Sequence, residues 1–328
     1  MRKLLTLIAI CQALIFAMSA YSADIVTLRA AHVFKTDFSA HKAVADFAQR
    51  LEKMSNGTIK VEIYPNQQLG NERECLEGAS LGSHDIALTG AAGWAVLNPK
   101  LGTFELPFLY RDMEHQRKVF TSDMKEVVDN LFSEIGLKFL AYYAYGLRST
   151  LTTKKEIVTM DDFKGLKIRV PEVPIFVQTF KALGANPTPI NYGETYTGLQ
   201  TNVVEGVEGS PESMVSMKFV EICKYYTLTR HQSPPILMAI NKARFEKFTP
   251  DQQNMILEAA SGSGETAFDN VLKANEDAIQ TMKDSGIKVN TPSPELLSQM
   301  ESAVQVVYDD LGAKYGGNDL IQQIKAIK

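Results

Sequence analysis

The chain has 328 residues, of which 34 are basic and 38 are acidic, so the formal net charge at pH 7 is −4. A chain of about 300 residues exceeds what one hydrophobic core usually covers, which predicts two lobes. No lysine- and arginine-rich run or basic helix face occurs, so we expect no nucleic-acid partner.

The first 23 residues have the three parts of a secretory signal peptide. Two cations precede the apolar run Leu4–Ala17, and small residues follow up to Ala23. The run is too short for a stable membrane span, so we predict cleavage near residues 20–23 and an exported protein. The alternative is a retained N-terminal anchor.

Strands and helices alternate in the next part of the chain. We expect strands at Val26–His32, Thr58–Tyr64 and Asp85–Leu88, with helices at Ser39–Ser55 and Glu72–Leu81. This alternation predicts an α/β fold with mostly parallel sheets. Ligands of such folds bind at the carboxyl ends of the strands, so the residues after each strand are candidates for a binding site.

His32 ends the first of these strands and is either a ligand contact or a structural histidine. His41 follows nine residues later, at a helical spacing that we expect to place it away from His32. The five histidines show no metal-ligand spacing, so we predict no metal site and no cofactor. Cys75 and Cys223 lie in apolar helical context, which favours buried free thiols over a disulfide.

Polar and small residues follow the second and third strands. Asn71 is placed to cap a helix that begins with Glu72 and Arg73. Thr89–Trp94 combines small residues, which let a backbone approach a ligand, with the only tryptophan of the chain. Trp94 either forms an apolar wall of the site or packs between elements.

Arg169 interrupts the β-branched run Leu166–Val170, which Pro171 ends. A guanidinium group offers a planar fork of donors that matches a carboxylate, so an arginine at a strand end is a natural anchor for an acidic ligand. The alternative is an ion pair with a protein carboxylate. The candidate partners are Glu172, Glu194 and Glu208.

The later part of the chain predicts connections that return between the lobes. A tyrosine-rich strand at Gly136–Tyr145 leads to Arg148, and the strands Tyr225–His231 and Ile236–Ile240 cross back. A long helix is expected from about residue 250 to 283, with an interruption at Ser261–Gly264. Further helices are expected at residues 295–314 and 320–328.

Several stretches resemble the solute-binding proteins of TRAP (tripartite ATP-independent periplasmic) transporters, the DctP-type family. They are Gly165–Pro171, Leu183–Pro189 and Glu194–Gly206, and the similarity extends to Tyr64–Gly70 and Leu106–Phe108. The resemblance covers nearly all of the chain after the leader. It implies a two-lobed periplasmic binding protein of type II-like fold, with strands crossing the hinge and a long helix spanning both lobes.

The resemblance also implies how the chain divides and what it works with. We expect the first lobe to comprise residues 24–145 and about 235–275, and the second lobe residues 146–234 and about 276–328. The expected protein is a periplasmic monomer that binds a small organic anion and delivers it to TRAP membrane subunits.

The same resemblance implies the roles of individual residues. Arg169 would make a bidentate pair with the ligand's carboxylate, and Arg148 would assist it from the cleft. Tyr192 stands where the family often has an aromatic residue near the ligand. The turn at residues 71–73 would line the cleft.

The sequence departs from the family at Gly209 and Ser210, which precede Pro211. Many relatives with carboxylate ligands have an asparagine here that steers the anchoring arginine. The Ser210 hydroxyl, the Gly209 amide or a water molecule would have to replace it.

The favoured ligand is a monocarboxylate sugar acid or a related hydroxy acid. Aromatic acids stacked on Trp94 and the tyrosines, and polyol phosphates shared by two arginines, are the alternatives. The sequence has no nucleophile elbow, phosphate loop or zinc signature, so we do not expect an enzyme. An exported enzyme on a two-lobed scaffold, or a binding protein that presents its ligand to a sensor, remain the other classes.

Overall fold

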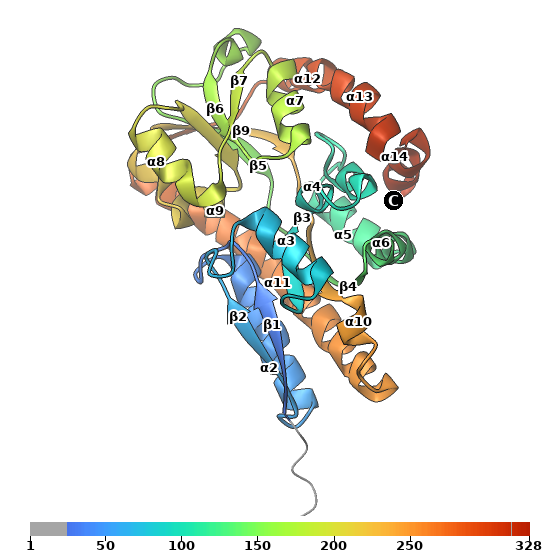
Figure 1. The fold of residues 1–328 in the computed structure, drawn as a ribbon. Helices are drawn as coiled ribbons and strands as arrows, with labels where there is room; N and C mark the ends of the chain where they lie inside the picture. Colours follow the sequence, from blue (N-terminus) through green and yellow to red (C-terminus); the bar gives the residue numbers. More distant parts are fainter. Residues whose placement is uncertain (1–24, 316) are drawn as a thin grey trace, which may run out of the picture.

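The computed structural model describes residues 25–315 and 317–328 and contains two separate sheets flanked by helices (Figure 1). The predicted signal peptide at residues 1–23 lies outside the described residues. Within the described part of the chain, no helix is both long enough and apolar enough to cross a membrane.

The first sheet has five strands in the order β2-β1-β3-β10-β4. β1 pairs in parallel with β2 and β3, whereas β10 is antiparallel to both of its neighbours, β3 and β4. The strands are β1 (Val26–Ala31), β2 (Ile59–Tyr64), β3 (Ile86–Gly90), β4 (Leu137–Tyr143) and β10 (Ile236–Asn241).

The second sheet has six strands in the order β11-β9-β5-β8-β6-β7. β6 is parallel to β7 and β8, and β5 is antiparallel to β8 and β9. The strands are β5 (Arg148–Thr152), β6 (Lys167–Val170), β7 (Asn186–Pro189), β8 (Gly206–Gly209), β9 (Tyr225–Gln232) and β11 (Lys288–Asn290).

The prediction of mostly parallel sheets is confirmed, because in each sheet all strands but one run in the same direction. The exceptions are β10 in the first sheet and β5 in the second. The chain enters the second sheet through β5 and re-enters the first through β10. β5 and β10 each begin at the edge of the sheet where the carboxyl ends of their neighbours lie, so each is antiparallel to its neighbours. The two-lobed α/β fold with hinge-crossing strands is confirmed, and the crossings are residues 144–147 and 233–235.

Helices connect the strands and cover the sheets (Figure 1). The longer ones are α2 (Ser39–Met54), α3 (Glu72–Leu81), α5 (Met113–Thr121), α6 (Met124–Ser133), α7 (Pro174–Ala182), α11 (Pro250–Asp284), α12 (Pro294–Ala303), α13 (Gln305–Tyr315) and α14 (Gly317–Ala326). The short ones are α4 (Ala91–Trp94), η1 (Pro99–Glu105), η2 (Met160–Phe163), η3 (Tyr192–Glu194), α8 (Thr195–Gln200), α9 (Pro211–Ser216), η4 (Phe219–Glu221) and α10 (Lys242–Phe245).

Helix α11 is the long lobe-spanning helix that the family resemblance implies. Thr249 begins it with a capping box, and the helix packs on α2 and β4 beside the first sheet and on α9 and β11 beside the second. It runs without a break through Ser261–Gly264, where the sequence predicts an interruption. The glycine at position 264 is explained by close packing of the helix on β4. A Cβ atom on Gly264 would lie 2.8 Å from the Tyr142 carbonyl oxygen.

We propose that the two sheets form the cores of two lobes, divided as the sequence predicts. The C-terminal helices contact both of them, since α13 packs against α7 and also against η1. The predicted helix at 295–314 is divided at Val304 into α12 and α13. Cys75 and Cys223 are buried free thiols, as predicted.

Hydrogen bonds join the two lobes directly. The backbone N–H and the hydroxyl of Ser39 both donate to Glu212 Oε1, at 2.8 and 2.7 Å. The N-cap residue of α2, Phe38, makes no capping hydrogen bond with its side chain. Glu212 of the other lobe caps the helix instead. Gln67 Nε2 likewise donates to Asn191 Oδ1 at 3.0 Å. The two lobes are therefore in direct contact in this structure.

Gly264 and Gly262 allow a matched test of this packing. Replacing Gly264 by alanine would press a methyl group onto rigid backbone, and we expect a loss of about 1–3 kcal/mol in the free energy of unfolding. A Cβ atom on Gly262 would instead lie 2.9 Å from Arg50 Nη1, at the end of a long, partly exposed side chain that can shift more easily than backbone. Gly262→Ala should therefore be neutral or stabilise the helix by up to about 1 kcal/mol. Urea unfolding of both variants measures the difference, and equal stabilities would contradict the packing explanation.

Candidate functional site

A cavity lined by residues of both sheets and of the segments that follow their strands lies between the two sheets. Its first-lobe wall includes Phe34, Glu72, Thr89, Gly90 and Glu105. Its second-lobe wall includes Arg148, Arg169, Phe176, Tyr192 and Glu208. Most of these residues lie at or just beyond the carboxyl ends of strands, where the fold class predicts a ligand.

Arg169 lies near the end of β6 and is only 3% exposed. Its Nε donates to the Ile190 carbonyl oxygen at 2.9 Å, and its guanidinium carbon lies 5.8 Å from the centre of the Tyr192 ring. Burial lowers the pKa of Arg169. Among the described residues, no carboxylate forms an ion pair with this guanidinium, so its terminal N–H groups are available to an anion in the cavity.

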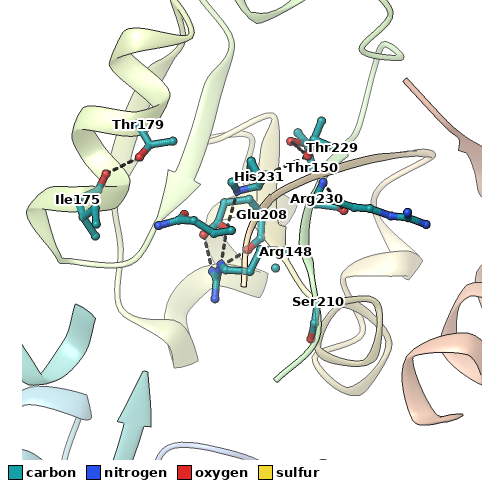
Figure 2. Close-up of polar contacts among 12 residues, drawn as sticks. Arg148, Thr150, Ile175, Thr179, Glu208, Ser210, Thr229, Arg230 and His231 are labelled. Carbon is teal, nitrogen blue, oxygen red and sulfur yellow. Dashed lines mark hydrogen bonds and ion pairs between the residues drawn. The ribbon is translucent and has the colours of Figure 1, made fainter. Parts of the chain in front are cut away.

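Arg148 at the start of β5 is already paired with a protein carboxylate, Glu208 of β8 (Figure 2). Arg148 Nε donates to Glu208 Oε2 at 2.5 Å, and Nη2 donates to Oε1. Its guanidinium also lies over the rings of Phe176 and Tyr145, at 4.8 and 5.4 Å. Glu208 is thus the partner of Arg148 and not, as the sequence allows, of Arg169.

A short chain of hydrogen bonds holds Glu208 in place (Figure 2). Burial alone would raise the pKa of Glu208, but the charge of Arg148 and hydrogen bonds from His231 and Arg148 lower it to about 2. Burial lowers the pKa of His231. A neutral His231 therefore donates from Nε2 to Glu208 Oε2 at 3.3 Å and accepts at Nδ1 from the Thr229 hydroxyl at 2.9 Å.

Four of the predicted site residues line this cavity: Arg169, Arg148, Glu72 and Tyr192. Glu72 accepts a hydrogen bond from the Thr89 hydroxyl, which orients its carboxylate across the end of β3. The structure therefore brings the two predicted cations and one predicted acid into a single site.

Three other predicted residues lie away from the cavity. Asn71 caps α3 by accepting from the Glu74 backbone N–H at 3.0 Å. Arg73 lies on the exposed side of the same helix, in an ion pair with Glu77. Trp94 is fully buried in the first-lobe core, where its Nε1 donates to the Leu237 carbonyl oxygen at 2.9 Å. Trp94 therefore packs between elements, the second of its two predicted roles.

His32 is fully buried and does not line the cavity. The Phe34 backbone N–H donates to its Nδ1 at 3.2 Å, which leaves Nε2 to donate to His41 Nδ1 at 3.1 Å. The prediction that these histidines lie apart is wrong, because the turn after β1 folds back onto the first turn of α2. Burial and the neighbouring His41 lower the pKa of His32 to about 3, so it is a neutral structural histidine.

Gly209 and Ser210 also lie outside the cavity lining. The Ser210 hydroxyl caps α9 by accepting from the Ser213 backbone N–H at 3.3 Å, so it does not replace the asparagine of relatives. At Gly209 a Cβ atom would lie 2.4 Å from Met214 Cε and 2.7 Å from Ser213 Oγ. The space that a longer side chain would need is thus filled by α9.

Sequence reasoning missed Glu105, a cavity residue that is 2% exposed. Its Oε2 accepts the Ala92 backbone N–H at 2.7 Å, and Gln232 Nε2 donates to its carbonyl oxygen at 2.9 Å. Glu105 stands inside Leu101–Tyr110, a stretch apolar enough to be buried between lobes. An acidic residue inside a buried stretch was the available signal.

The sequence profile of the DctP family, described as bacterial extracellular solute-binding protein family 7, matches residues 30–314. The chain belongs to this family. It is 32% identical over 275 residues to the 2,3-diketo-L-gulonate-binding periplasmic protein YiaO of Escherichia coli, and the match covers 84% of each chain. The predicted resemblance is confirmed.

Solved structures of TRAP periplasmic solute-binding proteins have the same fold. The protein from Xanthobacter autotrophicus, with bound β-D-galacturonate, is 32% identical, has a TM-score of 0.88, and is matched over 92% of this chain and 100% of its own. The protein from Sulfurospirillum deleyianum, with bound succinate, is 28% identical, has a TM-score of 0.86, and is matched over 93% and 100%. The DctP fold thus accommodates both sugar acids and dicarboxylates.

Among the acids of the site, Glu208 should be the one whose neutralisation destabilises the folded protein most. We expect Glu208→Gln to lower the free energy of unfolding by about 3–5 kcal/mol, because it leaves the buried Arg148 without its counter-charge. Glu77→Gln, which breaks the exposed pair with Arg73, should cost less than about 1 kcal/mol. Denaturant unfolding near neutral pH compares the two.

The pH dependence gives a separate check on the Arg148–Glu208 pair. Because the pKa of Glu208 falls from 4.5 to about 2 on folding, its contribution to stability is complete above about pH 4.5 and is lost as pH falls towards 2. Glu208→Gln should lose less stability than the unmutated protein across that interval. Parallel losses in the two proteins would show that Glu208 is not the titrating group.

Proposed function

We propose that this solute-binding protein captures a monocarboxylate sugar acid, or a related hydroxy acid, in the cavity between its lobes. The observation that carries the proposal is the buried guanidinium of Arg169, which lines the cavity and, among the described residues, makes no ion pair with a carboxylate. A buried charge is costly unless it is paired, so a carboxylate ligand would supply the missing partner.

The two cavity arginines differ in what they can do. Arg148 is neutralised by Glu208 and held by two bonds to its carboxylate. It contributes a donor near the ligand but little net charge. Arg169 is then the anchor, with its planar fork matching a carboxylate and the Tyr192 ring beside it.

The surroundings favour a polyhydroxylated acid over the other ligand classes. Glu72 and Glu105 line the first-lobe wall and are suited to hydroxyl groups. Trp94 is in the core and is not available to stack on an aromatic acid. A phosphate dianion would need two free cations, and Glu208 already engages one of them.

We propose that lobe closure couples capture to delivery. The interlobe bonds of Ser39 with Glu212 and of Gln67 with Asn191 form only when the lobes meet. A ligand that bridges Arg169 and the first-lobe acids would favour that closed state by its differential affinity. The closed protein would then dock in the periplasm, as a monomer, on the membrane subunits of a TRAP transporter.

A thermal-shift screen of the protein without residues 1–23 tests the ligand class. The panel contains sugar acids, dicarboxylates, aromatic acids and polyol phosphates. Binding to the native state raises the melting temperature by mass action, so the sugar acids should give the largest shift, several degrees or about 2–4 kcal/mol at saturation. A larger shift from another class, or turnover of any panel compound, would overturn the proposal.

Arg169→Lys tests the anchor. The variant keeps the charge but loses the fork of donors, so we expect the affinity for the sugar acid to fall by about 2–3 kcal/mol, measured by titration calorimetry. Arg73→Lys makes the same exchange at the exposed pair with Glu77 and should leave the dissociation constant unchanged. An unchanged constant in Arg169→Lys would remove Arg169 as the anchor.

A further inference from the structure

Two glycines of the first lobe leave room for two carboxyl groups at the cavity. A Cβ atom on Gly90 would lie 2.8 Å from Glu105 Oε2. One on Gly93 would lie 2.7 Å from Thr89 Cγ2 and 3.1 Å from Glu72 Oε1. Gly90 has an ordinary extended backbone, with φ −58° and ψ 152°, so its conformation does not require glycine. The space taken by the Glu105 carboxyl group explains why position 90 is small, and at position 93 the Thr89 and Glu72 side chains take the space together.

The two walls of the cavity therefore present different chemical groups. The first-lobe wall presents Glu72 and Glu105, whereas the second-lobe wall presents Arg169 and the neutralised pair of Arg148 with Glu208. A ligand that spans the cavity finds one place for an anionic group, at Arg169. The far end of such a ligand would lie beside the carboxyl groups of Glu72 and Glu105.

We propose that Glu105 is a specificity-determining residue, which in its protonated form makes hydrogen bonds to hydroxyl groups at the far end of the ligand and offers no cation to a second carboxylate there. The inference rests on the proposed function and names the ligand more closely: a monoanion, carboxylate at one end and hydroxyls at the other. It also assigns the buried acid of η1 a purpose beyond capping α4.

The protonation of Glu105 supports this assignment. Burial raises its pKa to about 8, although the hydrogen bond from Ala92 and the charge of Arg148 act in the opposite direction. The charged and titratable groups around it are Arg148, Glu72, Glu208 and Tyr110. At neutral pH Glu105 is thus a neutral acid that accepts the Ala92 N–H at one oxygen and can donate its proton to a ligand hydroxyl.

A consequence for pH dependence follows from the sign of this shift. Above about pH 8 the free protein loses the Glu105 proton, and the wall facing the anion becomes more negative. A bound anion favours the protonated form, so binding there takes up a proton. The affinity for a sugar acid should therefore fall as the pH rises through 8.

Galactonate and galactarate form a matched pair of probes, since they differ only in a hydroxymethyl group and a carboxylate at the far end. By titration calorimetry at about pH 7, galactarate should bind at least about 100-fold more weakly than galactonate, because its second carboxylate would be buried without a cation partner. From about pH 7 to about pH 9.5, the dissociation constant for galactonate should rise at least about 5-fold. Proton uptake, measured in buffers of different ionisation enthalpy, should increase with pH.

The isosteric variant Glu105→Gln resembles the protonated acid but has no proton to lose, so it should bind galactonate with little pH dependence and without the proton uptake, and should keep the preference over galactarate at about pH 7. Glu77→Gln, an exposed acid outside the cavity, should behave as the unmutated protein does. If Glu105→Gln fails to fold, the proton uptake of the unmutated protein still tests the inference. Tight galactonate binding without discrimination or proton uptake would overturn the assignment of Glu105 alone, whereas absence of binding by any sugar acid would overturn the proposed function.

Discussion

The ion pair between Arg148 and Glu208 determines what the rest of the cavity can do. It is buried, has two hydrogen bonds between charged groups, and is held from behind by His231. A buried pair of this kind adds little net stability compared with apolar packing, but losing either member is costly. Its importance here is that it consumes one of the two cavity cations, so Arg169 alone is left to attract an anion.

The fold supplies the cavity by directing strand ends towards it from both lobes. β1, β3, β6 and β8 all end there, and the entering strands β5 and β10 run the opposite way between them. Polar side chains placed just after a strand therefore meet those of the other lobe. This arrangement places the acids of the first lobe and the arginines of the second on opposite walls of the cavity.

The sequence predicted the architecture and the cations well. Strand ends, helix caps and the arginine at the end of an apolar run carry local signals, and Arg169 was predicted in this way, whereas the family resemblance implied the site role of Arg148. In the first lobe the right segments were predicted but not all of the right residues. The β1 turn contributes Phe34 instead of His32, and the helix start contributes Glu72 but neither Asn71 nor Arg73, because the direction of a side chain depends on tertiary packing.

Residues whose role depends on distant partners could not be predicted. The contact between His32 and His41 requires the turn after β1 to fold back, and the partner of Glu208 is fixed by the antiparallel register of β5 and β8. Trp94 has a large apolar side chain of the kind that can line a ligand site, yet its indole N–H donates to the Leu237 carbonyl oxygen in the core. Glu105 was missed because its neighbours predict only burial, and no local pattern shows which surface a buried acid faces.

We propose above all that a ligand carboxylate in the cavity pairs with Arg169 and neutralises its charge. Titration calorimetry with the sugar acid that gives the largest thermal shift, set against the neutral sugar of the same ring, tests it most directly. The two ligands differ only in the group that Arg169 would bind. We predict that the neutral sugar binds about 3 kcal/mol more weakly or not measurably, since Arg169 would stay buried and unpaired. Equal affinity for the two would contradict the claim.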